Sequence, residues 1–323
     1  MVLKITLPPE GLFIRELSLS ELLSFGEIYL EIEGDTVIIG REEEFKDKLK
    51  YDLEQGKGVL NDLKPYKKNY GKVIEVAEKV FNGGIDEFLK DDKEEYFIPL
   101  VFPEIMEAER WWGGWGGTGK GEKRTVGVNR QTLILSLLGF YKYQIYSYFT
   151  KDGNFSVLAL VDNTIVSDMC RPSVNKEKIR LTKDSVKKLS HMSRLLVFST
   201  VLSEEGCQEL LLLKKEQHRA EIYEKDPHTS IKPIIHFWTL VNDENVKNDF
   251  ISLANNYPDL FNRVSNYIFD GIRRTLTPAE VIFMIARDTY LNQEDLILTR
   301  KDMEKIREAL EKIWSEEEVF SEL

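Results

Sequence analysis

The chain has 323 residues, of which 42% are hydrophobic and 31% are charged. This composition excludes a disordered protein, and the length allows a sizeable core divided into two or three units. The most apolar run, residues 132–140, is too short to cross a bilayer, and residues 1–10 lack the apolar stretch of a signal peptide. Two cysteines, Cys170 and Cys207, can supply neither a disulfide framework nor a cysteine-based zinc site. These features predict a cytoplasmic protein, and the many Lys, Glu and Ile residues beside few Cys and Met suit a thermophile.

The net charge of −11 argues against a nucleic-acid partner, but the charge is unevenly distributed along the chain. Residues 1–110 carry a net charge of −10, residues 111–200 of +8 and residues 201–323 of −9. A localised positive region is what phosphate binding requires, whatever the total charge. The alternative is that the two acidic flanks simply pack around the basic segment, and the charge count alone favours neither.

The first forty residues indicate strands around one short helix. Residues 1–7 favour a strand, and Ser18-Leu-Ser-Glu21 matches a capping box that would open a helix ending at Gly26. Residues 28–39 alternate apolar and polar side chains on either side of Gly34-Asp35, which predicts a β-hairpin.

Charged and mostly helical sequence follows. Residues 42–69 favour helix with an interruption at residues 56–58, and residues 72–81 form a further helical pattern. Asn82-Gly83-Gly84 supplies the stop signal of that helix. Residues 96–102, with a proline among them, are typical of a buried strand near a sheet edge.

The second half begins with strands and ends in helices. Residues 131–140 fit either a helix or a strand, and two β-like runs around Asp152-Gly153 predict a second hairpin. From Leu181 onward the pattern is helical, and Thr277-Pro278-Ala279-Glu280 is a capping box with proline at the first helical position. One face of the last helix carries an apolar stripe of Met303, Ile306, Leu310 and Ile313.

These patterns together predict an α+β fold, in which a mixed N-terminal α/β region with β-hairpins is followed by a helical C-terminal domain. The expected division places a mixed α/β domain at residues 1–110. A basic Gly/Trp loop and β-hairpin region follows at residues 111–180, and a helical domain at residues 181–323.

The most conspicuous stretch is GGWGGTGKG at residues 113–121. The Walker A pattern GxxxxGK[ST] fits from Gly114 to Lys120, but Gly121 stands where a hydroxyl must bind Mg²⁺. The sequence that follows is a poor start for the helix that should face the phosphates, and Trp115 would crowd a nucleotide. The sequence therefore disfavours a phosphate-cradling P-loop, and no nucleotide or other cofactor is expected.

The same loop combines glycine, indole rings and positive charge. Glycine lets the backbone approach a partner closely, and Trp111, Trp112 and Trp115 can stack on bases or wedge between them. The alternative, favoured for each tryptophan taken singly, is a mobile joint whose rings pack on the protein. For the loop as a whole, the adjacent charge favours a nucleic-acid contact. That charge lies at Lys120, Lys123, Arg124 and Arg130.

A second basic element follows about fifty residues later in the chain. Residues 181–196 predict one continuous helix, with an apolar face opposite a basic one. Such a cationic stripe can lie along a phosphate backbone, although an ordinary solvated face is an equally good interpretation. The basic face comprises Lys183, Lys187, His191 and Arg194. The approach to the helix carries Arg171, Lys176, Lys178 and Arg180.

Signals for catalysis and metal binding are weak. Asp35 with Glu44 and Lys46 imitates a D…ExK nuclease pattern, but the last two fall in a predicted helix and not in a strand. The acidic cluster at residues 104–109 lacks a partner, and the histidines lack metal-ligand spacing. No catalytic residue or metal site is expected, although a spatial arrangement of catalytic residues leaves little trace in sequence. The histidines are His191, His218, His228 and His236.

In its overall organisation the chain resembles the large subunit of archaeal type I-A CRISPR effector complexes. The resemblance rests on WWGGWGGTGKGEKR running into NRQTLILSLLGFYKYQIYSYF, between a mixed N-terminal region and a helical C-terminus. It implies a non-catalytic subunit that helps to hold guide RNA and target DNA and inspects a short flanking motif. It also implies contacts with other subunits of the complex and with a helicase-nuclease. Since no run is long enough to cross a bilayer, no contact with a membrane is expected.

Two other classes of function stay open. A metal-dependent nuclease would need carboxylates that converge in space. A protein–protein scaffold would need no contact with nucleic acid.

Overall fold

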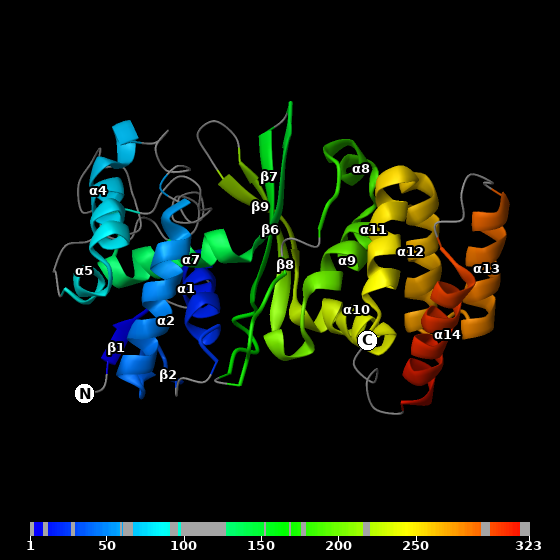
Figure 1. Cartoon of the computed structure of the whole chain (residues 1–323), viewed down its shortest axis with the longest axis horizontal. Helices are drawn as coiled ribbons and strands as arrows, with labels where there is room; N and C mark the ends of the chain where they lie inside the picture. The colour runs from blue at the N-terminus through cyan, green and yellow to red at the C-terminus, as the bar shows by residue number, and fades with distance from the viewer. Residues whose placement is uncertain are drawn as a thin grey trace, which may run out of the picture. The chain divides into compact units, whose positions relative to one another are not determined.

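A computed structural model gives the architecture of the chain (Figure 1). The structure describes residues 3–8, 12–26, 30–58, 60, 67–90, 96–97, 127–151, 153–167, 169–175, 179–215, 220–291 and 298–316. The described residues form two compact units. Unit 1 comprises Met1–Val174 and Glu205–Lys225, and unit 2 comprises Asn175–Glu204 and Asp226–Leu323. The predicted α+β class is confirmed, because the described strands are followed by a helical C-terminal region.

Unit 1 contains three antiparallel sheets among its described residues, with strand orders β1-β3-β2, β4-β5 and β6-β7-β8-β9. Its strands are β1 (Leu3–Thr6), β2 (Leu30–Glu33), β3 (Thr36–Ile39), β4 (Tyr96–Phe97), β5 (Gly127–Val128), β6 (Gln144–Thr150), β7 (Gly153–Val161), β8 (Gln208–Lys215) and β9 (Ala220–Asp226). Its helices are α1 (Phe13–Leu23), α2 (Glu42–Gln55), η1 (Gly56–Gly58), α4 (Lys67–Gly83), α5 (Ile85–Leu89) and α7 (Arg130–Tyr143).

The first hairpin forms as predicted and is fastened to α1 by a buried arginine. Strands β2 and β3 pair across Gly34-Asp35, where Gly34 has a φ of +58°, a conformation that glycine adopts readily. The guanidinium of Arg15 donates hydrogen bonds to the carbonyls of Pro8 and Gly34, each at 2.6 Å, and to Asp35 Oδ1 at 2.8 Å. One side chain therefore joins the end of β1, the hairpin turn and α1.

Helix α1 is buried along its whole length, and no side chain caps its first turn. Its start was therefore predicted at the wrong residue. The helix begins at Phe13, so the predicted capping box at Ser18-Leu-Ser-Glu21 is wrong. The Ser18 hydroxyl lies inside the helix and donates to the carbonyl of Ile14 at 2.9 Å. Helix α7 approaches α1 so closely that a Cβ on Gly139 would lie 2.3 Å from the carbonyl oxygen of Leu17. Only glycine fits at that contact between the two helices.

Several other predictions for unit 1 are confirmed. Helix α2 gives way to the short helix η1 at the predicted interruption, and α4 ends before Gly84, which has a φ of +73°. The ambiguous residues 131–140 are helical and belong to α7. The hairpin of β6 and β7 forms, but it begins at Gln144 because the preceding aromatic residues complete α7.

The hairpin of β8 and β9 contradicts the prediction that the chain is helical from Leu181 onward. Strand β8 pairs antiparallel with β7, so that Leu211 lies opposite Leu158 and Leu213 opposite Ser156. Leu158, Leu211 and Leu213 all belong to the hydrophobic core that includes α1. The apolar run of β8 is leucine-rich, and leucine is a good helix former, so composition gave no strand signal. Pairing with β7 decides its structure.

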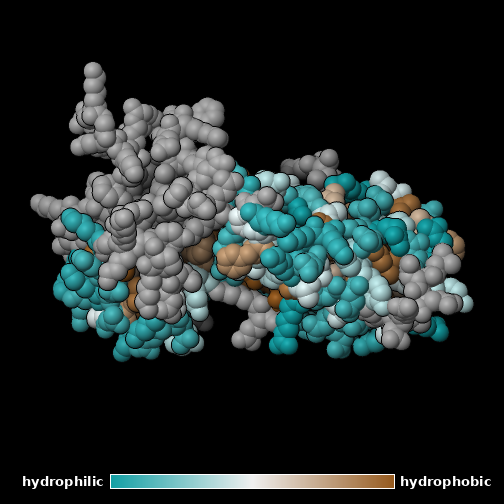
Figure 2. Space-filling view, turned by 90° about the horizontal axis from the view of Figure 1, so that it is seen from above, coloured by the Kyte–Doolittle hydropathy of each residue, from teal (hydrophilic) through white to brown (hydrophobic). Residues whose placement is uncertain are grey.

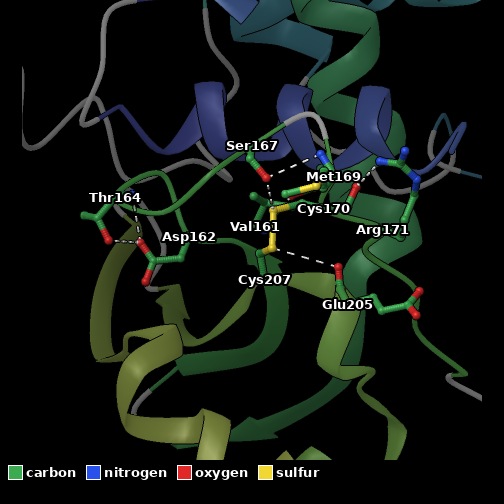
Figure 3. The surroundings of a disulfide bond; sticks show 10 residues. Val161, Asp162, Thr164, Ser167, Met169, Cys170, Arg171, Glu205 and Cys207 are labelled. Carbon is green, nitrogen blue, oxygen red and sulfur yellow. Dashed lines mark hydrogen bonds between the residues drawn. A yellow bond between two sulfur atoms is a disulfide. The ribbon is translucent and has the colours of Figure 1, made fainter. Parts of the chain in front are cut away.

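The two cysteines, which cannot form a framework of several disulfides, instead pair with each other. Cys170 and Cys207 form a disulfide across a sequence separation of 37 residues, with Cα atoms 5.6 Å apart (Figure 3). Backbone hydrogen bonds flank it: Arg171 N–H donates to the Glu205 carbonyl at 2.7 Å, and Asp162 N–H donates to the Cys207 carbonyl at 2.9 Å. The disulfide therefore joins the start of β8 to the segment after β7, within unit 1.

The described part of unit 2 is helical. The capping box at Thr277 is present: its hydroxyl accepts from Glu280 N–H at 3.3 Å, and the Glu280 carboxylate accepts from Thr277 N–H at 2.8 Å. Three residues of the predicted apolar stripe of the last helix, Ile306, Leu310 and Ile313, are buried, whereas the fourth, Met303, is only partly buried. The helices are α8 (Lys183–Lys188), α9 (His191–Phe198), η4 (Ser199–Val201), η5 (Glu204–Gly206, shared with unit 1), α10 (His228–Val241), α11 (Glu244–Asn256), α12 (Pro258–Ile272), α13 (Pro278–Leu291) and α14 (Arg300–Ser315).

A bilayer-spanning segment would need a long helix that is apolar throughout. Within the part of the chain that the structure describes, no helix meets that requirement.

Candidate nucleic-acid interface

A group of exposed cations in the described part of unit 2 lies on and beside α8. We call residues 179–194 the basic segment. Figure 1 draws α8 at the upper edge of unit 2, and the view from above in Figure 2 shows mostly hydrophilic atoms on the described surface of that face. One acidic residue, Asp184, is exposed in the same segment. The exposed cations are Arg180, Lys183, Lys187 and Lys188.

The basic segment is not the single helix that the sequence predicted. Helix α8 ends at Lys188, Leu189 is extended, and Ser190 caps a new helix by accepting a hydrogen bond from Ser193 N–H at 3.2 Å. The break arises because serine competes well for the capping position and poorly for a helix interior. Lys183 and Lys187 still share a face of α8. His191 and Arg194 belong to α9, so one continuous basic stripe does not form.

Two asparagines hold the backbone on either side of α8. The Asn255 side chain, at the end of α11, accepts from Thr182 N–H at 2.7 Å and donates to the Arg180 carbonyl at 2.5 Å. The Asn262 side chain, in α12, accepts from Ser190 N–H at 2.8 Å and donates to the Lys188 carbonyl at 3.0 Å. We call these two contacts the asparagine clamps.

The remaining described cations of the predicted interface contact the protein itself. Arg130 is mostly buried and donates to the Glu87 carbonyl at 2.9 Å, which fastens α7 to α5. Arg171 donates to the Cys170 carbonyl at 2.9 Å beside the disulfide (Figure 3). Arg194 donates to the Leu189 carbonyl at 3.1 Å. Each of these three arginines therefore has a structural contact.

Most of the predicted loop site is not described. The structure brings Arg180, Lys183 and Lys187 together on the surface of the basic segment. The predicted residues that lie outside the described residues are Trp111, Trp112, Trp115, Lys120, Lys123, Arg124, Lys176 and Lys178.

Carboxylates do converge in unit 1, but around a lysine. Lys225 Nζ lies 3.1 Å from Glu16 Oε1 and 2.9 Å from Glu209 Oε1, and both glutamates are buried. Burial raises the pKa of Glu209 to about 8, with the nearby Glu16 charge adding to the effect and Lys225 opposing it. The ammonium group thus takes the position between the two glutamates that a metal ion would need. Among the described residues, no group of three or more His, Cys, Asp or Glu could hold a metal ion.

The three residues that imitate the D…ExK pattern make other contacts. Glu44 and Lys46 both lie in α2, as expected, and the Lys46 ammonium pairs with Glu42 at 2.8 Å within that helix. Asp35 pairs instead with Arg15.

No protein-family model matches the chain. A protein of Saccharolobus solfataricus that is named as CRISPR-associated is 60% identical over 322 residues, and the alignment covers 99% of each chain. This chain belongs to the CRISPR-associated proteins. The name of that relative specifies neither a subunit nor a ligand.

Sequence reasoning overlooked three residues of the candidate interface in this CRISPR-associated protein. Lys188 could have been found, since it adjoins Lys187 in a segment already identified as basic. Asn255 and Asn262 could not, because they lie about seventy residues further along the chain and asparagine on a helix carries no local signal for such a contact.

A further buried carboxylate of the CRISPR-associated protein, Glu21, lies on α1. Glu21 is fully buried, and the Lys142 ammonium lies 3.4 Å from it and 2.8 Å from Asp52. Burial raises the pKa of Glu21 from 4.5 to about 8, an effect that Lys142 partly offsets. Burial alone would lower the pKa of Lys142, but the Glu21 and Asp52 carboxylates raise it above its usual value.

Replacing Glu21 by glutamine is expected to flatten the pH dependence of stability. Because the native pKa of Glu21 is about 8 and the ordinary value is 4.5, the native state binds more protons than the unfolded state between those pH values. The wild-type protein therefore loses stability as the pH rises through this window, by on the order of a few kcal/mol from this group. Urea denaturation at a series of pH values measures the effect. The exposed Glu54→Gln is the control, and an identical pH slope for Glu21→Gln and wild type would contradict the assignment.

Proposed function

We propose that this CRISPR-associated protein is a non-catalytic, nucleic-acid-binding large subunit of a type I-A effector complex. The observation that carries the proposal is the group of exposed cations at residues 180–188 on an otherwise acidic chain. Phosphate contacts of this kind orient a protein on a nucleic acid without reading its sequence. The relationship to a CRISPR-associated protein makes guide RNA and target DNA the natural ligands.

The Gly/Trp loop supplies a second expected contact. Its indole rings could stack on bases, and the cations that follow it in the sequence could help to read a flanking motif. In RNA-guided complexes the protein reads such a motif while the guide RNA pairs with the target. In this proposal the loop is the principal contact, and the basic segment lies along the phosphate backbone. Lys120, Lys123, Arg124, Lys176 and Lys178 extend the positive region in sequence.

The acidic remainder of the chain suits protein partners. Residues 201–323 carry a net charge of −9, which would keep nucleic acid away from that part. We therefore propose that other subunits of the complex and a helicase-nuclease bind there and on the acidic N-terminal residues. The proposed compartment is the cytoplasm. An intracellular disulfide is then unusual except in proteins of hyperthermophilic archaea and bacteria.

The salt dependence of binding tests this proposal. The full chain would be titrated with a labelled DNA duplex and a labelled single-stranded RNA over a series of salt concentrations. For duplex DNA, the slope of log K against log salt changes by about 0.9 for each phosphate that the protein neutralises. We expect Lys183→Ala/Lys187→Ala/Lys188→Ala to flatten the slope by about 2–3. Deletion of residues 113–121 should weaken binding further and alter the preference for flanking sequence.

The control carries the same change of charge elsewhere. Lys4→Ala/Lys50→Ala/Lys57→Ala removes three exposed lysines of unit 1, outside the proposed interface. An equal effect of both triple variants would show that only net charge matters. If the wild-type chain binds neither probe, alone or within the assembled complex, the scaffold alternative is favoured.

A further inference from the structure

The two asparagine clamps repeat one arrangement at the two ends of α8. In each, a basic residue is followed by a buried leucine and then by a helix-capping Thr or Ser: Arg180-Leu181-Thr182 before α8 and Lys188-Leu189-Ser190 before α9. Asn255 and Asn262 each accept from the N–H of the capping residue and donate to the carbonyl of the basic residue. A side-chain amide thus bonds to the backbone on both sides of each leucine, as a neighbouring strand would.

Interactions within the basic segment alone would not hold the clamped backbone in place. Helix α8 has six residues, and an isolated helix of that length is unstable in water. Its first turn is capped by Thr182, and the Ser185 hydroxyl donates to the Asn255 carbonyl at 2.8 Å. Its last residue is followed by the extended Leu189. The orientation of α8 therefore depends on α11 and α12, through contacts made at both of its ends.

The carbonyls that are clamped belong to two of the exposed cations. Arg180 immediately precedes Leu181 of the first clamp, and Lys188 immediately precedes Leu189 of the second. Lys183 and Lys187 project from the helix between the two clamps. Fixing the backbone at both ends sets the spacing of all four cations. Long cationic side chains lose entropy when they bind phosphate, and a fixed backbone reduces the part of that loss that falls on the main chain.

We propose that Asn255 and Asn262 are positioning residues of the nucleic-acid interface, which hold the basic segment so that its cations meet successive phosphates together. The inference rests on the proposed function, since it assigns the clamps to the same surface. The asparagines themselves need not touch the nucleic acid. Without the clamps, the cations remain but act separately, so fewer of them bind at one time.

The test compares Asn255→Ala/Asn262→Ala with a matched control in the full chain. Asn256→Ala/Asn266→Ala removes two exposed asparagines from the same two helices. The probe is the labelled DNA duplex, titrated over a series of salt concentrations. We expect the clamp variant to weaken binding by about tenfold and to flatten the salt slope by about 1–2, although no charge has been removed. Amide hydrogen exchange at Thr182 and Ser190 should accelerate in the same variant.

The salt slope separates positioning from simple destabilisation. In a variant that is merely less folded, a smaller fraction of the protein can bind the probe. The folded molecules still bind with the wild-type dependence of log K on log salt. A wild-type slope in the clamp variant, with exchange at Thr182 and Ser190 accelerated, would overturn the inference and leave the proposed function intact. If the triple lysine variant also keeps the wild-type slope, the proposed interface itself is wrong. A flattened slope in the control variant would likewise overturn the role of the clamps.

Discussion

Replacing Arg15 by alanine is expected to lower the free energy of unfolding of unit 1 by about 3–5 kcal/mol, from lost hydrogen bonds to buried carbonyls and a new cavity. The side chain is 3% exposed and bonds to the carbonyls of Pro8 and Gly34 and to Asp35. Removing it leaves the two carbonyls without these bonds and opens a cavity beside α1, and both effects destabilise. Amide hydrogen exchange in β1, α1 and the first hairpin measures the change within unit 1.

The Asp35→Ala variant separates the ion pair from the backbone contacts. The Asp35 side chain is 54% exposed, so water replaces its bond to Arg15 at little loss, and we expect a change below about 1 kcal/mol. If the two variants lose the same stability, the charge pair dominates and the contacts to the carbonyls contribute nothing measurable.

Replacing Cys207 by serine is expected to lower the free energy of unfolding by about 4 kcal/mol, from the entropy of loop closure. The disulfide spans 37 residues, and the chain that it closes includes residues 175–204 of unit 2. Without the bond, the unfolded chain gains conformational freedom, while the folded chain retains the flanking hydrogen bonds at Arg171 and Asp162.

Urea denaturation of the oxidised protein, with and without a reductant, measures the contribution of the disulfide. Reductant should destabilise the wild-type protein and leave Cys207→Ser unchanged. Equal stability of the wild-type protein under both conditions would contradict the prediction.

Local chemistry was enough to predict several elements. Gly34 sits where a tight turn needs a positive φ, and Thr277 and Glu280 cap a helix with bonds between residues three apart. The apolar stripe of α14 follows from its helical period. In each case the deciding interaction joins residues close in sequence, so the pattern of residue types contains it.

The charge pattern also located the basic segment, but its shape depended on competition between local signals. The period of apolar residues favoured one helix over residues 181–196, whereas Ser190 forms a cap that ends that helix and starts another. The spacing of apolar residues alone does not tell whether a capping hydrogen bond at Ser190 or a continued helix is more stable. The packing of Leu189, which is buried at the break, adds to the preference for two helices.

The remaining features join residues that are distant in sequence, and only the tertiary structure decided them. Strand β8 is a strand because β7 lies beside it, Cys170 meets Cys207 through that same pairing, and Asn255 and Asn262 reach α8 from other helices. The sequence by itself determined the α+β class, the hairpins of β2 with β3 and of β6 with β7, the capping box at Thr277 and the position of the positive charge. It could not determine which backbone groups an asparagine would hold or which buried glutamate would meet a lysine, because those partners are chosen by packing and not by spacing along the chain.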